Sequence, residues 1–159
     1  MLKLQMSCAT DLGASRAVNQ DSVAVFPQMQ LVILADGMGG HNAGEVASRK
    51  AIESVRDGLR DGLDLEQAFI YANAEIYELS MQVEAYSGMG TTLVAALYDG
   101  LKVQIANVGD SRLYRFRKNQ LQQMTRDQTV AQDMRELGIE HKDGKHVTAF
   151  EHVLTNAMG

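Results

Sequence analysis

The sequence of 159 residues contains one cysteine, one proline and no tryptophan. With Cys8 alone, the chain can form neither an internal disulfide nor a zinc cage of thiolates, and this scarcity is typical of a reducing compartment. The first eight residues lack the long apolar core of a secretory signal. No uninterrupted apolar run approaches the roughly 20 residues that cross a bilayer. We therefore expect a cytoplasmic protein that has no membrane partner.

Positive charge is also scarce, because 15 lysines and arginines stand against 20 aspartates and glutamates and give a formal net charge of −5. A protein that binds nucleic acid needs a basic stripe to neutralise the phosphate backbone, and none is visible. The longest basic group is more often a solvated surface; it comprises Arg112, Arg115, Arg117 and Lys118. The composition therefore argues against a nucleic-acid partner.

The length and the 45% of apolar residues fit one domain, residues 1–159, with a substantial core. Apolar residues recur every three or four positions in 44–59 and 65–83, which predicts two helices, the second capped by Asp64. A shorter helix is expected at 129–137. Alternating or β-branched segments predict strands at 1–11, 22–26, 30–35, 91–98, 101–108, 111–116 and 120–124. These blocks favour an α+β fold, in which helices pack against antiparallel sheet.

The most informative segment is 35–44, where Asp36 follows the apolar run 31–35 and enters a glycine-rich turn before the first helix. A carboxylate at such a strand-to-helix junction is well placed for chemistry. The glycines allow the backbone to approach a bound ion or phosphate closely, which a β-carbon would obstruct. We therefore expect a functional site around Asp36.

Two other turns also carry acids, Asp21 after Asn19-Gln20 and Asp110 in the segment 108–112. Each alone could be an ordinary turn, because aspartate and glycine are common turn residues. Together with Arg16, however, they combine carboxylates that suit hard divalent cations with a guanidinium that suits phosphate. A nucleotide cradle is the weaker alternative, because the glycine turn has neither P-loop nor dinucleotide spacing.

Five segments in order resemble the metal-dependent type-2C protein phosphatases in their bacterial form: 10–21, 35–45, 88–92, 107–112 and 121–127. The resemblance implies a four-layer α-β-β-α fold, an antiparallel β-sandwich flanked by helices. It also implies a signalling hydrolase that acts on phosphoserine and phosphothreonine with two Mn²⁺ or Mg²⁺ ions, and a third in bacterial relatives. Its substrate would be a phosphoprotein, the product of a bacterial serine/threonine kinase.

The resemblance also assigns roles to individual residues. The implied metal ligands are Asp21, Asp36, Gly37 and Asp110, and the implied catalytic residues are Arg16, Asp36 and His41. Asp36 would bridge two ions and Gly37 would offer its carbonyl oxygen, while Arg16 would bind the phosphate. His41 is open to two interpretations, a proton donor to the leaving group or a solvent-facing loop histidine.

The family domain is longer than this chain, and the phrase at 154–159 lies well inside it in relatives. Residues 1–159 would then be its N-terminal two-thirds, with C-terminal strands and two further acids missing. Two interpretations follow. The chain is a fragment of an active phosphatase, or it is a catalytically impaired module that binds a phosphorylated partner or scaffolds an assembly.

Overall fold

The computed structural model describes residues 4–14, 16–40, 43–139 and 148–159. The strands are β1 (Asp21–Phe26), β2 (Leu31–Met38), β3 (Gly90–Thr91), β4 (Leu93–Tyr98), β5 (Val103–Val108), β6 (Tyr114–Arg117) and β7 (Gln120–Gln123). The helices are α1 (Ala43–Arg60), α2 (Leu65–Gln82), the short 3-10 helix η1 (Glu84–Tyr86) and α3 (Val130–Glu136). No helix in this described part is both long and apolar enough to cross a membrane.

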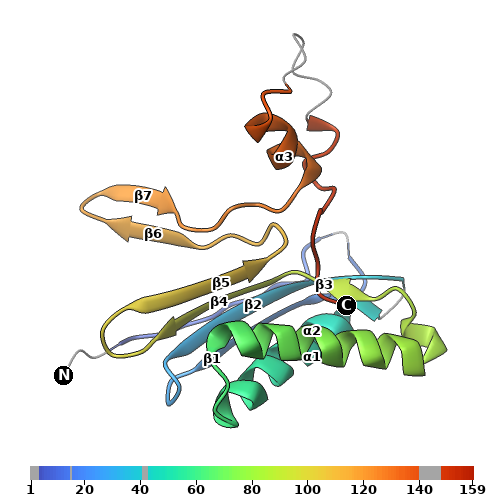
Figure 1. Ribbon diagram of the computed structural model, residues 1–159, viewed down its shortest axis with the longest axis horizontal. Coiled ribbons are helices and arrows are strands. Elements are labelled where there is room, and N and C mark those ends of the chain that lie inside the picture. The colour runs from blue at the N-terminus through green and yellow to red at the C-terminus, as the bar shows by residue number, and fades with distance from the viewer. Residues whose placement is uncertain (1–3, 15, 41–42, 140–147) are drawn as a thin grey trace.

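The main sheet is antiparallel and has five strands in the order β1-β2-β4-β5, with β3 paired to the end of β2. Helices α1 and α2 cover one of its faces (Figure 1). Strand β2 alternates accordingly, with Leu31, Ile33 and Ala35 buried in the core that the sheet shares with the helices. One layer of helices on one sheet therefore holds most of the apolar core.

The two long helices form where their apolar periodicity predicts them. Helix α1 buries Ala47, Ala51 and Val55 against the sheet. The predicted cap of α2 is confirmed, because the Asp64 carboxylate accepts a hydrogen bond from the Gln67 amide at 2.8 Å and the Gln67 side chain accepts one from the Asp64 amide at 3.1 Å. This reciprocal pair satisfies two backbone donors that a helix start leaves open.

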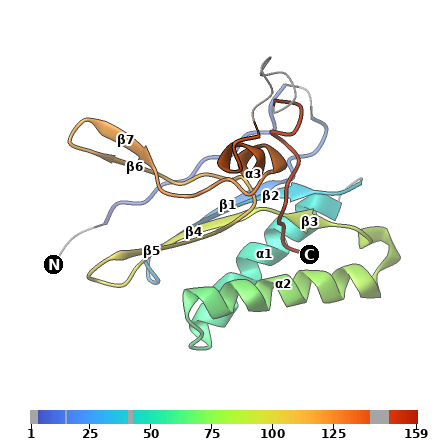
Figure 2. The ribbon, with the colours of Figure 1, turned by 45° about the horizontal axis from the view of Figure 1, so that its top comes forward.

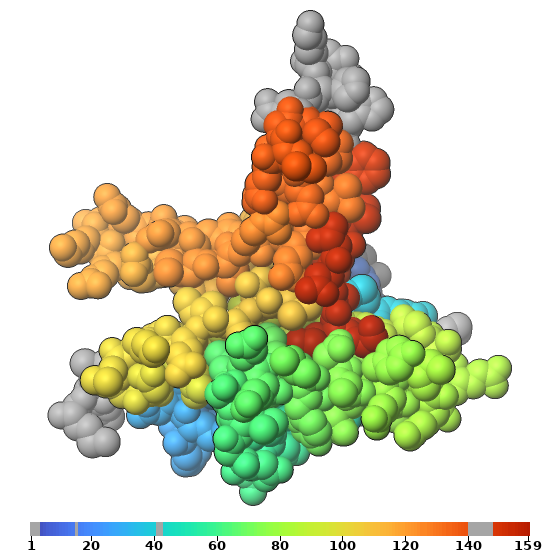
Figure 3. Space-filling model, viewed as in Figure 1, coloured from blue at the N-terminus to red at the C-terminus, as the bar shows by residue number. Residues whose placement is uncertain are grey.

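Strands β6 and β7 form a separate hairpin on the side of the sheet opposite α1 and α2, and α3 stands beyond it (Figure 2). The hairpin turns at Lys118 and Asn119, whose positive φ angles of 52° and 59° match the twist that tight hairpins need. All its residues are exposed, and its tip projects freely (Figure 3). The α+β class with antiparallel sheets is confirmed; among the described residues, the second sheet of the predicted sandwich has two strands and no outer helix layer.

Two expectations about strands need correction. The segment 1–11 was expected to be a strand, but residues 4–11 pair with no other strand in the described structure and are almost all exposed. Although their apolar and polar residues alternate, no strand edge in the described structure pairs with them. Strand β2 does not end at Ala35, because Gly37 and Met38 pair with β3. Asp36 therefore lies inside a strand, opposite Asp21 of β1 on one side and hydrogen-bonded through its backbone to Thr92 on the other.

Gly37 and Gly44 allow β2 to pass very close to the first turn of α1. A β-carbon on Gly37 would lie 2.0 Å from the Gly44 carbonyl oxygen and 2.6 Å from that of Gln20. Both obstacles are backbone atoms, which cannot rotate away as a side chain can. The glycine at 37 therefore fixes how close the strand that carries Asp36 lies to α1.

We predict that Gly37→Ala lowers the free energy of unfolding by about 1–3 kcal/mol or more, because the new methyl group overpacks rigid backbone. Gly40→Ala is the matched control, since a β-carbon there meets nothing within 4 Å and the φ angle is not in the left-handed region. Urea denaturation of both variants measures the effect. Equal stability of the two would contradict this description of the β2–α1 contact.

Candidate active site

The site is centred on two carboxylates that the β1–β2 pairing places opposite each other. Asp21 begins β1, Asp36 lies near the end of β2, and the two are register partners. Directly opposed residues on an antiparallel pair have β-carbons about 5 Å apart, so like charges there repel each other. Both residues are exposed into a cleft of about 470 Å³. The sheet thus concentrates negative charge at one place open to solvent.

The same cleft is lined by Arg16 and Gly37. The structure therefore brings together four of the residues that the sequence predicted for the site, Arg16, Asp21, Asp36 and Gly37. No ion pair in the described part of the chain ties Arg16 to a carboxylate. Its exposed guanidinium can therefore bind an anion that enters beside the two acids.

The surroundings of Asp36 change the pKa of its carboxyl group. Partial loss of surrounding water raises the pKa of the Asp36 carboxyl to about 6, with the neighbouring Asp21 carboxyl adding to the rise by repulsion and hydrogen bonding. Asp110 raises this pKa further, while Arg16 lowers it. A bound divalent cation would offset this repulsion. The site in the absence of metal is therefore electrostatically unfavourable.

Two buried threonines hold the backbone of Asp36. The Asp36 amide donates to the Thr92 hydroxyl at 2.9 Å, while the Thr92 amide and the Thr91 hydroxyl donate to the Asp36 carbonyl, each at 2.9 Å. The Thr92 hydroxyl also shares a hydrogen bond of 2.7 Å with Ser111. Sequence reasoning placed Thr91 and Thr92 in a motif but gave them no role. The sequence feature that could have indicated their role is a pair of adjacent hydroxyl residues in an otherwise apolar segment.

Asp110 belongs to a neighbouring part of the site. Its loop is fixed by Gln128, which accepts a hydrogen bond from the Gly109 amide through its side chain at 2.8 Å and donates its own amide to the Gly109 carbonyl at 3.0 Å. Asp110 lines a separate hollow of about 440 Å³ and does not line the cleft of Asp36. Its effect on the Asp36 pKa shows that the two are electrostatically linked. Its role as a metal ligand stays a prediction.

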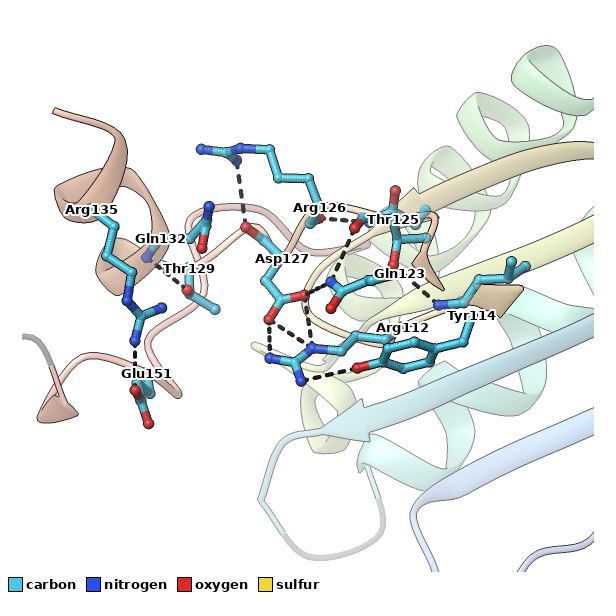
Figure 4. A network of polar contacts seen from close by, with 12 residues as sticks. Arg112, Tyr114, Gln123, Thr125, Arg126, Asp127, Thr129, Gln132, Arg135 and Glu151 are labelled. Carbon is cyan, nitrogen blue, oxygen red and sulfur yellow. Dashed lines mark hydrogen bonds and ion pairs between the residues drawn. The ribbon is translucent and has the colours of Figure 1, made fainter. Parts of the chain in front are cut away.

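Arg112, unlike Arg16, forms an ion pair with a carboxylate of the described chain. Its guanidinium donates to both carboxylate oxygens of Asp127, with a shortest distance of 2.5 Å, and to the Tyr114 hydroxyl at 3.2 Å (Figure 4). Gln123 also donates to Asp127, at 2.9 Å. This network joins the β5–β6 connection to the segment before α3. It neutralises Arg112, so that Arg16 is the guanidinium available to an anion in the cleft.

The metal-ligand residues stay a prediction, which the described residues neither complete nor test. In the described ranges, no group of three or more histidine, cysteine, aspartate or glutamate residues is arranged to hold a metal. Asp21 and Asp36 offer the carboxylate oxygens that Mn²⁺ and Mg²⁺ prefer, and the raised pKa of Asp36 fits a pair that needs a cation. Two carboxylates do not neutralise two divalent ions. His41 lies outside the described residues, so its assigned role stays a prediction.

A larger hollow, of about 800 Å³, lies on the β6–β7 hairpin and is lined by Arg115, Arg117, Lys118, Gln120, Leu121 and Gln122. It contains no carboxylate and none of the predicted site residues. Size alone does not define an active site, whereas the smaller cleft combines opposed acids, a free arginine and a perturbed pKa. We therefore take the cleft around Asp36 as the candidate active site.

The fold and the site define a class, an α+β protein with opposed acids and an arginine in one cleft. Comparison with known proteins agrees with that class. The sequence profile of the family described as Protein phosphatase 2C matches residues 13–137. The serine/threonine phosphatase stp of Listeria welshimeri is 37% identical over 163 residues, which cover 94% of this chain and 65% of that protein.

Solved structures of serine/threonine phosphatases have a fold similar to that of this chain. The crystal structure of the Mycobacterium tuberculosis serine/threonine phosphatase PstP/Ppp superposes with a TM-score of 0.82 at 36% identity, over 93% of this chain and 65% of that one. A second structure is the catalytic domain of the phosphatase PstP in complex with two manganese ions, with a TM-score of 0.77 at 35% identity, over 93% of this chain and 64% of that one. The chain belongs to the protein phosphatase 2C family. It spans about 65% of the length of the curated relatives that it matches first.

We predict that metal-free Asp36→Asn melts at a higher temperature than the wild type at pH 7, and that this difference shrinks towards pH 4. The native pKa of Asp36, about 6, lies above its ordinary value of 3.8. Between these values the folded state binds more protons than the unfolded state, so wild-type stability falls as pH rises. Asparagine stays neutral and avoids this loss. Melting curves of both proteins in EDTA at pH 4, 5, 6 and 7 test this prediction. A difference in melting temperature that stays constant across that range would show that ionised Asp36 does not destabilise the fold.

Proposed function

We propose that this chain carries the greater part of a metal-dependent phosphatase that hydrolyses phosphoserine and phosphothreonine in proteins. The observation that carries the proposal is the placement of Asp21 and Asp36 opposite each other in a cleft that also contains Arg16. The membership in the protein phosphatase 2C family supports it. The cellular setting that we propose is the cytoplasm, with a phosphoprotein made by a bacterial serine/threonine kinase as the substrate.

Each residue of the cleft has a role in the proposed chemistry. Mn²⁺ or Mg²⁺, when bound, supplies Lewis-acid stabilisation of phosphoryl oxygens and lowers the pKa of a coordinated water. Asp36 and Asp21 would hold the metal through carboxylate oxygens, and Gly37 would add its carbonyl. Arg16 would bind two phosphoryl oxygens through its planar guanidinium and so orient the ester. His41 would protonate the leaving alkoxide, and Asp110 would attract a further cation.

A second candidate is a phosphatase-like module that binds a phosphorylated partner without hydrolysing it. One observation favours it for residues 1–159. The described residues hold no group of three or more histidine, cysteine, aspartate or glutamate side chains arranged to hold a metal. Arg16 could still bind a phosphate group in such a module, because it needs no metal to do so.

We predict that Arg16→Ala raises the KM of residues 1–159 for p-nitrophenyl phosphate in Mn²⁺ at least about tenfold, because the phosphate loses a charge-assisted hydrogen bond worth about 1.5–3 kcal/mol. Arg16→Lys should recover only part of the loss, since an ammonium cannot bind two oxygens in one plane. Arg60→Ala, which removes an exposed arginine of α1 outside the cleft, is the matched control. Steady-state kinetics with and without EDTA measure these values.

The same assay separates the two candidate functions. Hydrolysis that requires Mn²⁺ and is lost in Asp36→Asn supports the phosphatase. A folded protein without hydrolysis, which binds a phosphothreonine peptide more tightly than the Arg16→Ala variant does, favours the binding module. If the folded chain neither hydrolyses nor binds phosphorylated ligands, both proposals are wrong.

A further inference from the structure

Helix α2 has two apolar faces, although only one of them contacts the core. The buried face consists of Leu65, Ala68, Phe69, Ala72 and Ile76. On the opposite side, Ile70, Ala74, Tyr77 and Met81 follow one another at intervals of four, three and four residues and form what we call the α2 stripe. Such spacing places side chains next to one another on a helix surface. Ile70 is 64% exposed, Tyr77 54% and Met81 71%.

The neighbouring helix shows what an ordinary solvent face looks like in this protein. At its exposed positions α1 carries charged residues, among them Arg49, Glu53 and Arg60. Single exposed apolar residues are common on protein surfaces and need no explanation. Four in one continuous row with no charged residue among them are characteristic of a surface that binds another protein. In Figure 3 α2, in bright to yellowish green, lies at the front and no other segment covers it.

The charges beside the stripe restrict what can bind there. Helix α2 contains three glutamates and neither lysine nor arginine. Glu75 is paired with Lys50 of α1 at 2.6 Å. At about 100° per residue, Glu66 and Glu78 flank the stripe on its two sides. Neither forms an ion pair with another described residue, so both carboxylates are available to a partner.

A second copy of this chain fits the stripe poorly. A pair of α2 helices, parallel or antiparallel, would bring together two helices that carry Glu66 and Glu78 beside the stripe and neither lysine nor arginine. Each arrangement adds like-charge repulsion between two molecules that already carry a net charge of −5 each.

We propose that the α2 stripe is a docking surface for an amphipathic helix of a partner protein, whose apolar row is flanked by lysine or arginine. Helices pair in this way when apolar rows with intervals of three and four residues interdigitate. The glutamates beside the stripe would then meet cations of the partner and set its orientation. This surface lies on the far side of α2 from the core and is distinct from the candidate active site.

The test uses residues 1–159 and two synthetic helical peptides with the same leucine row, one flanked by lysines and the other by glutamates. Fluorescence anisotropy should show binding of the lysine peptide and not of the glutamate peptide. Met81→Asp should weaken binding at least about tenfold, because it removes the large apolar side chain that is most exposed in the stripe. Leu101→Asp is the matched control, because Leu101 is 94% exposed in the β4–β5 turn. Melting curves confirm that each variant folds.

A charge exchange makes the test specific. The double variant Glu66→Lys with Glu78→Lys should bind the glutamate peptide better than the lysine peptide, which reverses the wild-type order. The proposal is overturned if both peptides bind equally or neither binds, or if Leu101→Asp weakens binding as much as Met81→Asp does. It is also overturned if sedimentation shows a dimer of wild-type chains that Met81→Asp dissociates, because the stripe then joins two copies.

Discussion

The repulsion between Asp21 and Asp36 is the constraint on which the functional site depends. A sheet that served only stability would not place two acids opposite each other at a partly desolvated position, because like charges there cost free energy. Here the β1–β2 register does so, and the pKa of Asp36 rises to about 6, mainly because the carboxyl loses surrounding water and further because Asp21 lies opposite it. Positive charge beside such a pair offsets the repulsion, and Arg16 does so in part, because it lowers the pKa of Asp36. We therefore propose that the pair binds a cation.

The surrounding fold resists the relaxation that this repulsion would otherwise cause. Thr91 and Thr92 bind the amide and carbonyl of Asp36, and Thr92 shares a hydrogen bond with Ser111 in the loop that carries Asp110. On the other side, Gly37 lies so close to α1 that no side chain fits between them. The carboxylate is therefore positioned by buried backbone contacts, and its own charge does not determine where the strand lies.

Much of this arrangement could be predicted from the sequence, and the limits have physical reasons. The apolar periodicities of α1 and α2 and the cap at Asp64 depend on neighbours along the chain, so they were predicted correctly. The strand expected at 1–11 was wrong for its described residues, 4–11, because an alternating pattern indicates amphipathicity but does not supply a partner strand. Asp21 and Asp36 were chosen from turn motifs, yet their direct opposition follows from a strand register that no local pattern reveals. The same holds for Thr92 and Ser111, which are 19 residues apart in sequence.

We propose that the described residues supply one side of a metal centre. Manganese titration by isothermal calorimetry at pH 6 and pH 8, in two buffers of different ionisation enthalpy, tests the central claim directly. If Asp36 has a pKa of about 6 in the free protein, binding should release about half a proton at pH 6 and almost none at pH 8. Asp36→Asn should lose most of the binding. Manganese uptake that releases no proton at pH 6, or that is unchanged in Asp36→Asn, would contradict the account.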